Sequence, residues 1–324
     1  MMFRTGSKAP PGAFSVPLHR RALLTGLGAA GLFALGGGRF SAAATAPAEH
    51  RIGAVTAKVI SDGVLNVPLA FSLPETSPED AAALFKAHGL PEQGSPSQTN
   101  VVLIRSGDET ILIDAGSGPT FQQTAGKLQE NMEAAGIDPA SITKVVFTHG
   151  HADHLWGAID DFDDDLRFPN ARYVISAAEW DFWTDPDTPG RVPDALKGMA
   201  MASARILKQL GDRIDRRKDG DSLAPGLSYL ATPGHTPGHM AILVESEGRK
   251  LIVGGDVLTN TAISFSRPGW RMGADYDRDR GIATRRKLLD LLASDKIPLI
   301  GFHLAWPGLG MVERKDNAYR FIPL

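Results

Sequence analysis

The chain has 324 residues, 43% of them hydrophobic, which is the composition of an ordinary globular protein with one large domain or two small ones. Charges nearly balance, with 34 Lys and Arg against 37 Asp and Glu. The absence of cysteine excludes disulfide bonds and thiolate metal ligands, so an oxidising compartment imposes nothing on this fold.

The first 46 residues differ from the rest of the chain. Arg20 and Arg21 precede an apolar stretch from Ala22 to Gly37, and small residues follow from Ser41 to Ala46. This order is typical of a secretory signal, and the paired arginines indicate the twin-arginine route. The apolar core is shorter than the roughly 20 residues of a membrane span, so we expect no stable membrane anchoring, with an anchor as the alternative. We therefore predict a signal peptide at 1–46, one domain at 47–324, and a periplasmic or secreted protein.

Removal of the predicted signal would change the charge of the protein. Residues 1–46 contain five basic and no acidic side chains, so 29 basic and 37 acidic residues remain and give a net charge of −8. A protein with this charge has no electrostatic reason to bind the phosphate backbone of a nucleic acid. We therefore expect no nucleic-acid partner.

After the signal, short apolar runs alternate with turn residues. An Asp62-Gly63 pair between two such runs predicts the turn of a β-hairpin, and Ser77 followed by Pro78 predicts the start of a helix. Pro, Gly, Ser and Gln residues at 91–98 predict a loop. The expected elements of this half are strands at Ala54–Ile60 and Val64–Val67, a helix that Gly89 ends, and strands at Val101–Ile104 and Thr110–Ile113.

The second half continues this alternation. Ser176 and Glu179 have the spacing of a capping box and predict the start of a helix. A further helix is expected from Ala195 to Leu210, and apolar strands are expected to begin at Val145, Leu251 and Leu299. Continuous apolar strands that alternate with helices indicate sheets covered on their faces, which is an α/β fold.

Polar residues gather where the strand that begins at Val145 ends. The chain there reads His149-Gly150-His151-Ala152-Asp153-His154, an HxHxDH motif. Because alternate residues of an extended chain lie on the same side, His149 and His151 can converge on one ion. Asp153 and His154 lie where the chain turns and can reach a second ion. Imidazole nitrogens and carboxylate oxygens are ligands of zinc and related divalent metals.

Further candidate ligands follow later strands. His235 lies in a turn rich in proline and glycine, Asp256 ends the run that begins at Leu251, and His303 ends the run that begins at Leu299. Five of the nine histidines fall into this set. Loops at one sheet edge can build a single site from such distant segments. His239 has no ligand position left, so we expect it either to have a structural role or to support the site from behind the ligands.

The ligand set as a whole resembles the dinuclear metal site of the metallo-β-lactamase superfamily. Within that superfamily, the stretches Phe302–Gly310 and Tyr319–Pro323 most resemble the methyl parathion hydrolase branch. The resemblance extends from Arg51 to the C-terminus. It implies an αββα sandwich, in which two mixed sheets pack together, helices cover the outer faces and the metal site lies at one edge.

The resemblance also implies roles for the candidate ligands. His149, His151 and His235 would bind one ion, Asp153, His154 and His303 would bind the other, and Asp256 would bridge the two. The two divalent ions are expected to be Zn²⁺ and to activate a bridging hydroxide as the nucleophile. Asp256 would also act in catalysis by relaying a proton to the leaving group.

Three further residues have roles implied by the resemblance. Asp114 follows a predicted strand and would orient a ligand histidine from behind, with a simple turn residue as the alternative. Phe121 and Trp183 would be walls of an apolar substrate pocket. A place in the hydrophobic core is the alternative interpretation of both aromatic residues.

The residue at the bridging position helps to choose among related activities. Zinc β-lactamases use cysteine or a non-ligand there, so Asp256 resembles the ester, lactone and phosphotriester hydrolases. We therefore expect a dinuclear-metal hydrolase of small neutral or apolar esters or lactones, with phosphotriesters as further candidate substrates. An N-acyl-homoserine lactone hydrolase is the alternative, although those enzymes commonly have tyrosine where this chain has Thr259. A non-catalytic periplasmic metal-binding protein is the alternative from another class, and a homodimer is kept open.

Overall fold

The computed structural model describes residues 46–94, 96–160 and 162–324, so the predicted signal peptide lies outside the described residues except for Ala46. Two seven-stranded sheets form the centre of the described part. The first sheet contains β1 to β7 in sequence order, antiparallel from β1 to β4 and parallel from β4 to β7. Its strands are β1 Ala48–Ile52, β2 Val55–Asn66, β3 Pro96–Ser106, β4 Glu109–Ile113, β5 Lys144–Val146, β6 Arg172–Ser176 and β7 Ile214–Arg217.

The second sheet is built from the rest of the chain, in the order β14-β13-β12-β11-β10-β9-β8. Only the β11–β12 pair is parallel among its described strands, so this sheet is mixed as well. Its strands are β8 Ser222–Ala224, β9 Leu227–Ala231, β10 Met240–Ser246, β11 Arg249–Val253, β12 Leu299–Ile300, β13 Leu309–Lys315 and β14 Ala318–Pro323.

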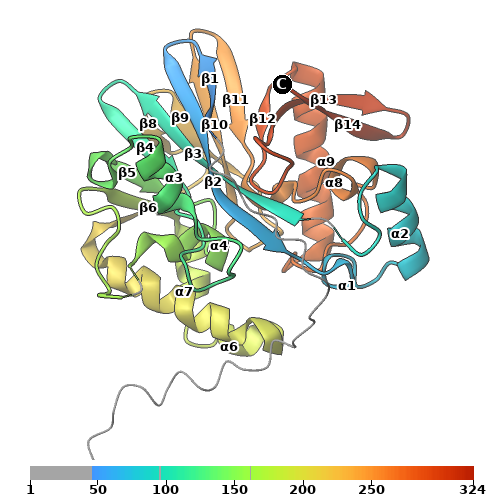
Figure 1. The fold of residues 1–324 in the computed structure, drawn as a ribbon, viewed down its shortest axis with the longest axis horizontal. Coiled ribbons are helices and arrows are strands. Elements are labelled where there is room, and N and C mark those ends of the chain that lie inside the picture. The colour runs from blue at the N-terminus through green and yellow to red at the C-terminus, as the bar shows by residue number, and fades with distance from the viewer. Residues whose placement is uncertain (1–45, 95, 161) are drawn as a thin grey trace, which may run out of the picture. The chain divides into compact units, whose positions relative to one another are not determined.

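Helices lie between these strands in the chain. The helices are α1 Leu69–Ser72, α2 Pro78–Ala87, α3 Leu128–Ala134, α4 Ala152–Leu155, α5 Ala177–Thr184, α6 Thr188–Arg191, α7 Lys197–Leu210, α8 Ile263–Ser266 and α9 Arg278–Asp295. In Figure 1, α8 and α9 lie beside β13 and β14. Helix α7 contacts α4, α5 and α6. No helix in the described part of the chain is both long and apolar enough to cross a membrane.

Buried apolar side chains fill the space between the two sheets. Val59 and Ile104 of the first sheet and Ile242 and Val253 of the second belong to one buried cluster. Successive side chains of a strand point to opposite faces, so each sheet also has an apolar outer face that needs a cover.

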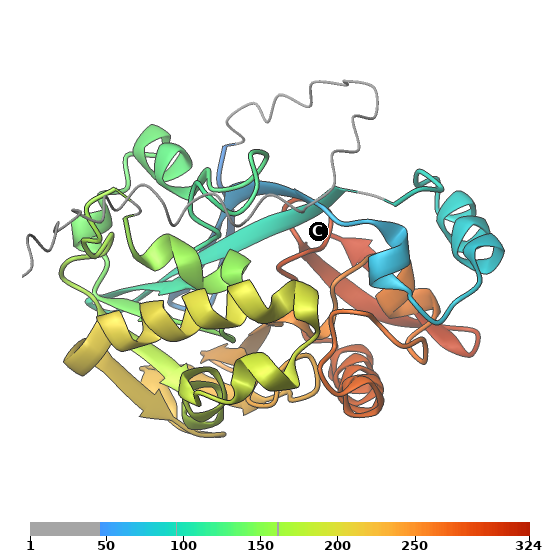
Figure 2. The ribbon, with the colours of Figure 1, turned by 90° about the horizontal axis from the view of Figure 1, so that it is seen from below.

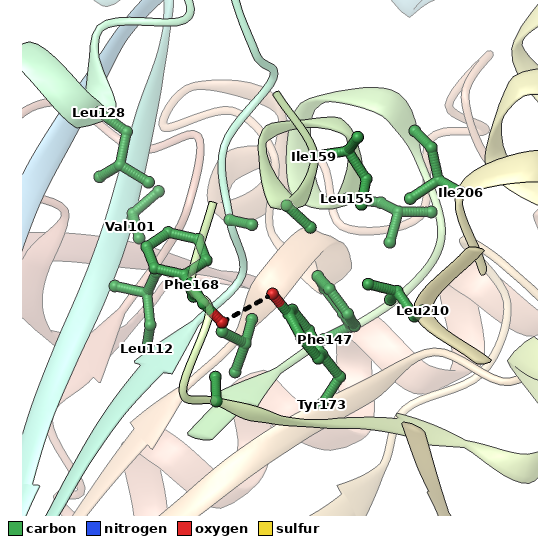
Figure 3. Close-up of a cluster of buried hydrophobic side chains, with 14 of the residues drawn as sticks. Val101, Leu112, Leu128, Phe147, Leu155, Ile159, Phe168, Tyr173, Ile206 and Leu210 are labelled. Atoms are coloured by element: carbon green, nitrogen blue, oxygen red, sulfur yellow. Dashed lines mark hydrogen bonds between the residues drawn. The ribbon is translucent and has the colours of Figure 1, made fainter. Parts of the chain in front are cut away.

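Helices provide that cover on both outer faces. Leu210 of α7 belongs to a buried cluster with Phe147 and Tyr173, in which the Tyr173 hydroxyl donates to the Phe168 carbonyl at 3.2 Å (Figure 3). Leu289 of α9 belongs to a separate cluster on the second sheet. In Figure 2, α7 is the yellow helix across the centre and α9 is the orange-red helix that is seen end-on to its right. The predicted αββα sandwich of two mixed sheets is therefore confirmed.

The predicted hairpin at Asp62-Gly63 is wrong. β2 runs without a turn from Val55 to Asn66, and only its register against β3 shifts, between Ser61 and Val64. Gly63 has a φ of +107° and bridges to Ala125, and a side chain there would meet the Thr124 carbonyl. The pair therefore forms a β-bulge that holds a neighbouring loop. Sequence alone does not separate the two, because a bulge and a turn both favour glycine.

The predicted helix starts are confirmed. The Ser77 hydroxyl accepts from the Asp80 amide at 3.1 Å, and the Ser176 hydroxyl accepts from the Glu179 amide at 3.0 Å. The first residues of one strand and one helix differ from the predicted ones by a few residues. β3 begins at Pro96, inside the predicted loop, and α7 begins at Lys197 instead of Ala195. The strands that were expected to begin near Val145, Leu251 and Leu299 are β5, β11 and β12.

Candidate metal centre

The HxHxDH motif lies in the loop that connects β5 to α4. β5 ends at Val146, and His151 is the N-cap of α4, with an extended backbone at φ −70° and ψ 159°. Asp153 and His154 lie within this single-turn helix. His149, Asp153 and His154 are buried, whereas His151 is half-buried and borders a cavity. One short loop thus directs four side chains toward the same edge of the sheets.

Three histidines and an aspartate form the first group. His151 Nδ1 lies 2.9 Å from His149 Nε2 and 2.9 Å from His235 Nε2. Asp256 Oδ2 lies 3.2 Å from His235 Nε2 and 3.9 Å from His149 Nε2. One atom of each of these four side chains lies within 4.8 Å of the others, so the group could hold a metal ion.

Asp153, His154 and His303 form the second group. Asp153 Oδ2 lies 3.4 Å from His154 Nε2 and 3.2 Å from His303 Nε2. The ligand atoms of these three side chains also lie within 4.8 Å of one another. The structure therefore brings together all seven predicted ligand residues, in two groups that could each hold an ion.

Asp256 faces both groups from the short turn Gly255–Val257 that follows β11. Its Oδ2 is 3.2 Å from His235 Nε2 and 3.2 Å from His303 Nε2, and its Oδ1 is 3.2 Å from His154 Nε2. Among the described residues, neither Asp256 Oδ1 nor His154 Nε2 has a hydrogen-bond partner, although both are buried. A carboxylate in this place can be shared by two ions.

The contacts of the histidine ring nitrogens that point away from the groups indicate whether the groups fit a metal. Each of these nitrogens contacts a neighbouring oxygen: His149 Nδ1 to Thr148 Oγ1 at 3.0 Å, His154 Nδ1 to Asp114 Oδ2 at 2.8 Å, His235 Nδ1 to Asp275 Oδ1 at 3.1 Å, and His303 Nδ1 to the Gln98 carbonyl at 2.8 Å. A carbonyl or carboxylate oxygen only accepts, so the ring nitrogen that faces it carries the proton. The inner Nε2 of a neutral ring is then a lone pair. Inner lone pairs packed against carboxylates fit divalent cations well.

Asp114 lies behind the second group, as the resemblance implied. It follows β4 with a left-handed backbone at φ 64°, which is an uncommon conformation for a residue with a side chain. Its carboxylate accepts from the Thr148 amide at 2.7 Å, from the Thr148 hydroxyl and from His154 Nδ1. These contacts hold the His154 ring in one orientation.

Two of the histidines are held neutral by their surroundings. Burial, together with the charge of neighbouring histidines, lowers the pKa of His149 well below its usual range. Burial and His235 lower the pKa of His151 to about 3. Both rings can therefore offer a lone pair to a cation at neutral pH.

Carboxylates around the other three histidines favour the charged form of each ring when no cation is present. Burial opposes their protonation, but nearby carboxylates outweigh it. Asp256, Asp153 and Asp114 raise the pKa of His154 well above its usual range. Asp256 and Asp275 raise the pKa of His235 to about 9, and Asp256 and Asp153 raise that of His303 to about 10. Protons here occupy the place that a metal would take.

Some supporting residues had no clear signal in the sequence. Asp275, which contacts His235, lies in a loop outside any motif. His239 was expected to support the site, and its Nε2 accepts from the Asp256 backbone amide at 2.9 Å while its Nδ1 contacts Thr232 Oγ1. His239 thus helps to set the position of the shared carboxylate.

Glu179 also acts differently from its predicted capping role. Its carboxylate accepts from the backbone amides of Gly150 and Gly238 at 2.9 Å each, and from Trp183 Nε1. Gly150 lies between His149 and His151, and Gly238 lies in the loop that carries His235. One buried carboxylate therefore ties together two ligand-bearing loops, and burial raises its pKa.

A cavity of about 280 Å³ opens over the two groups. The predicted ligands at its floor are His151, Asp153, His235, Asp256 and His303. Its walls are mainly apolar and include Leu65, Val67, Leu69, Phe71, Phe85, Phe121, Leu196, Met199, Ile263 and Met272. Among the described residues that line it there is no Lys or Arg.

The two aromatic residues that were expected in the pocket have different positions. Phe121 lines the cavity and packs edge-on against Trp156, with 5.7 Å between ring centroids. Trp183 is 2% exposed and does not border the cavity; it belongs to the hydrophobic core and supports His151 from behind, with centroids 5.5 Å apart. The pocket role of Trp183 is therefore corrected to a core position, because its indole is held by Glu179.

Comparisons with known proteins agree with this geometry. The sequence pattern of the metallo-beta-lactamase superfamily matches residues 94–300. The chain is similar to the probable metallo-hydrolase YqjP of Bacillus subtilis, with 31% identity over 52% of this chain and 54% of that protein. It is also similar to the N-acyl homoserine lactonase AttM of Azorhizobium caulinodans, with 28% identity over 47% of this chain and 52% of that protein. The alignments thus span about half of each relative.

A solved structure extends the similarity to most of the chain. It is that of AidC, a dizinc quorum-quenching lactonase in complex with a product, N-hexanoyl-L-homoserine. The TM-score is 0.81 at 27% sequence identity, and the match covers 86% of this chain and 97% of AidC.

Proposed function

This chain belongs to the metallo-beta-lactamase superfamily, and from that premise we propose that it hydrolyses small neutral esters and lactones with two bound divalent ions, zinc in the first instance. One observation carries the proposal. Two groups of histidine and aspartate side chains share Asp256 at the floor of an apolar cavity. A dinuclear site with an open side toward a small cavity is suited to hydrolysis of a bound substrate.

The residues of the chain would have different roles in hydrolysis. Bound divalent ions supply activation of water and polarisation of the carbonyl or phosphoryl oxygen of a substrate. The two histidine groups would each hold an ion, and the carboxylates of Asp114 and Asp275 keep the rings of His154 and His235 oriented. Asp256, whose carboxylate faces both groups, would be placed to take a proton and pass it to the leaving group.

The cavity supports a neutral, apolar substrate. Its walls offer aliphatic and aromatic surface for an acyl or aryl group, and no described basic side chain lines it to bind an anion. The net charge of −8 without residues 1–46 also disfavours anionic polymers such as nucleic acids. Aryl esters and aromatic lactones are therefore the proposed substrates, with phosphotriesters as a further group.

N-acyl-homoserine lactones are the second candidate substrates. The similarity to AidC and AttM supports this candidate, because both proteins are lactonases of that kind. Thr259 weighs against it, because tyrosine is common there in such lactonases. The Thr259 hydroxyl donates to the Met272 sulfur at 3.3 Å, so it is turned toward the cavity wall. We rank simple esters and lactones first for this reason.

A substrate panel tests the proposal. The protein from residue 47 onward, loaded with zinc, would be assayed against aryl esters, aromatic lactones, N-acyl-homoserine lactones, phosphotriesters and β-lactams. We expect the highest kcat/KM for an aryl ester or aromatic lactone. A β-lactam or nucleic acid ahead of every ester and lactone would contradict the proposal. Two bound ions without turnover of any substrate would favour the non-catalytic metal-binding protein instead.

We also propose that residues 1–46 direct export of the folded protein through the twin-arginine route. The proposal rests on Arg20, Arg21 and the apolar stretch that follows them. Export of a folded chain would allow the metal ions to be bound before the protein reaches the periplasm.

A further inference from the structure

A buried ion pair lies directly behind the first group of ligands. Asp275 and Arg285 are 6% and 1% exposed, and Arg285 Nη2 lies 2.8 Å from Asp275 Oδ2. The other carboxylate oxygen, Asp275 Oδ1, lies 3.1 Å from His235 Nδ1. Three side chains thus form a line from the helix α9 to a predicted metal ligand.

Arg285 has little freedom in this position. Its guanidinium also donates to the Pro268 and Trp270 carbonyls at 3.1 Å each, and to the Val257 carbonyl at 3.4 Å. Val257 follows Asp256 directly, so the same guanidinium contacts the turn that carries the shared carboxylate. A side chain with so many backbone partners holds Asp275 in one orientation.

The backbone around Asp275 is tied to the loop that carries His235. The Tyr276 amide donates to the His235 carbonyl at 3.0 Å, and the Asp277 amide donates to the Gly234 carbonyl at 2.9 Å. Gly281 of α9 lies so close that a Cβ there would be 2.5 Å from Asp275 Oδ2. The loop before α9, which packs against the first turn of that helix, therefore presents Asp275 to His235 at close range.

In each ligand group an aspartate from outside the group contacts the outer nitrogen of one histidine, but the two aspartates are held in different ways. His154 in the second group is backed by Asp114, and His235 in the first is backed by Asp275. Asp114 is held by Thr148 hydrogen bonds, whereas Asp275 is held by a buried arginine. A buried ion pair is costly to form, and a pair of apolar residues often stabilises a fold at least as well. The position of this pair beside a ligand points to a role in the site.

We propose that Asp275, held in place by Arg285, is a positioning residue that orients His235 and sets the affinity of the first ligand group for its ion. The proposal rests on the proposed metal-dependent function. Asp275 Oδ1 accepts a hydrogen bond from His235 Nδ1–H, so the proton of the neutral ring stays on Nδ1 and Nε2 is a lone pair directed at the other ligands. Arg285 occupies Oδ2, so the carboxylate cannot turn away from the histidine.

The test separates metal affinity from fold stability. Two stepwise Zn²⁺ affinities are measured by competition with a chromophoric chelator, and the thermal midpoint is measured on the metal-free protein. His151→Ala and His303→Ala identify which affinity belongs to which ligand group. The variants are Asp275→Leu, Arg285→Met and the double variant that removes both charges. Asp279→Asn is the control, because Asp279 is an exposed carboxylate of α9 that also pairs with an arginine.

We expect Asp275→Leu to weaken the affinity that His151→Ala identifies by about 10–100-fold, and the other affinity by less than about threefold. The double variant should regain much of the thermal midpoint while the affinity stays low, because a buried unpaired charge is gone but His235 still lacks its acceptor. The control should match the wild type in both measurements.

Two results would overturn the inference. One is recovery of both stability and Zn²⁺ affinity in the double variant, which would reduce Asp275 to a structural role. The other is an equal loss of both affinities. The proposed function fails separately, because it requires a wild-type protein with two bound ions to hydrolyse the ester and lactone panel. Full esterase activity with unchanged affinities in every Asp275 variant would remove only the inference.

Discussion

Loading the metal-free protein with two zinc ions should release about three protons per molecule at pH 7.5, because metal ligands must be deprotonated. The protons come from His154, His235 and His303, because nearby carboxylates raise the pKa of His154 well above its usual range, that of His235 to about 9 and that of His303 to about 10. His149 and His151 contribute none, since their pKa values are lowered and both rings are already neutral. A fourth proton would report that a bound water is also deprotonated.

The size of the effect follows from this count. With three protons displaced, the product of the two Zn²⁺ binding constants should rise about 1,000-fold per pH unit near pH 7.5, or about 4 kcal/mol. The slope should decrease as the pH approaches 9 and then 10, the pKa values of His235 and His303.

The same pKa shifts predict the stability of the metal-free protein. A histidine with a pKa above its unfolded value of about 6.5 contributes stability that is fully present below pH 6.5. That contribution is lost as the pH rises through about 9 for His235 and about 10 for His303. The metal-free protein should therefore lose stability between roughly pH 7 and 10.

Calorimetric titration of zinc into chelator-treated protein, in buffers of different ionisation enthalpy at pH 7.5, measures the proton count. His303→Ala is the matched control and should release fewer protons and bind the second ion more weakly. Binding of two ions with almost no proton release would refute the assigned charge states of the three histidines.

The remaining predictions concern the shared carboxylate, the cavity, the core and export. Asp256→Asn should lower kcat by about 100-fold or more while the protein stays folded; near-wild-type turnover with both ions bound would remove Asp256 from catalysis. Phe121→Ala should raise KM for aryl esters by about tenfold with unchanged metal content, since an aromatic contact contributes about 1 kcal/mol beyond its buried area. Trp183→Ala should instead destabilise the fold by about 3–5 kcal/mol in denaturant unfolding, and a change in KM alone would contradict its core position. Replacement of Arg20 and Arg21 by lysine should leave the precursor in the cytoplasm, and unchanged export on fractionation would point to another route.

Those parts of the site that are local in the chain could be predicted from the amino-acid sequence. His149, His151, Asp153 and His154 are recognisable because they are close together after an apolar strand, and a strand end is where a sheet presents its loops. The helix starts at Ser77 and Ser176 are equally local, because a cap needs only an amide three residues away. The layered fold came from the resemblance, and the two packed sheets confirm it.

Only the tertiary structure decided which distant residues support these ligands. Asp62 and Gly63 look like a turn until the loop that includes Ala125 packs against them, and Glu179 looks like a helix cap until two ligand-bearing loops bring amides to its carboxylate. Trp183 has a large aromatic side chain, which is typical of a pocket wall, but it lies in the hydrophobic core. Asp275 has no local signal at all, because its partner His235 is 40 residues away in the chain and the two meet only in the folded protein. Hydrogen bonds between such segments depend on packing, and packing is not encoded in any short stretch of sequence.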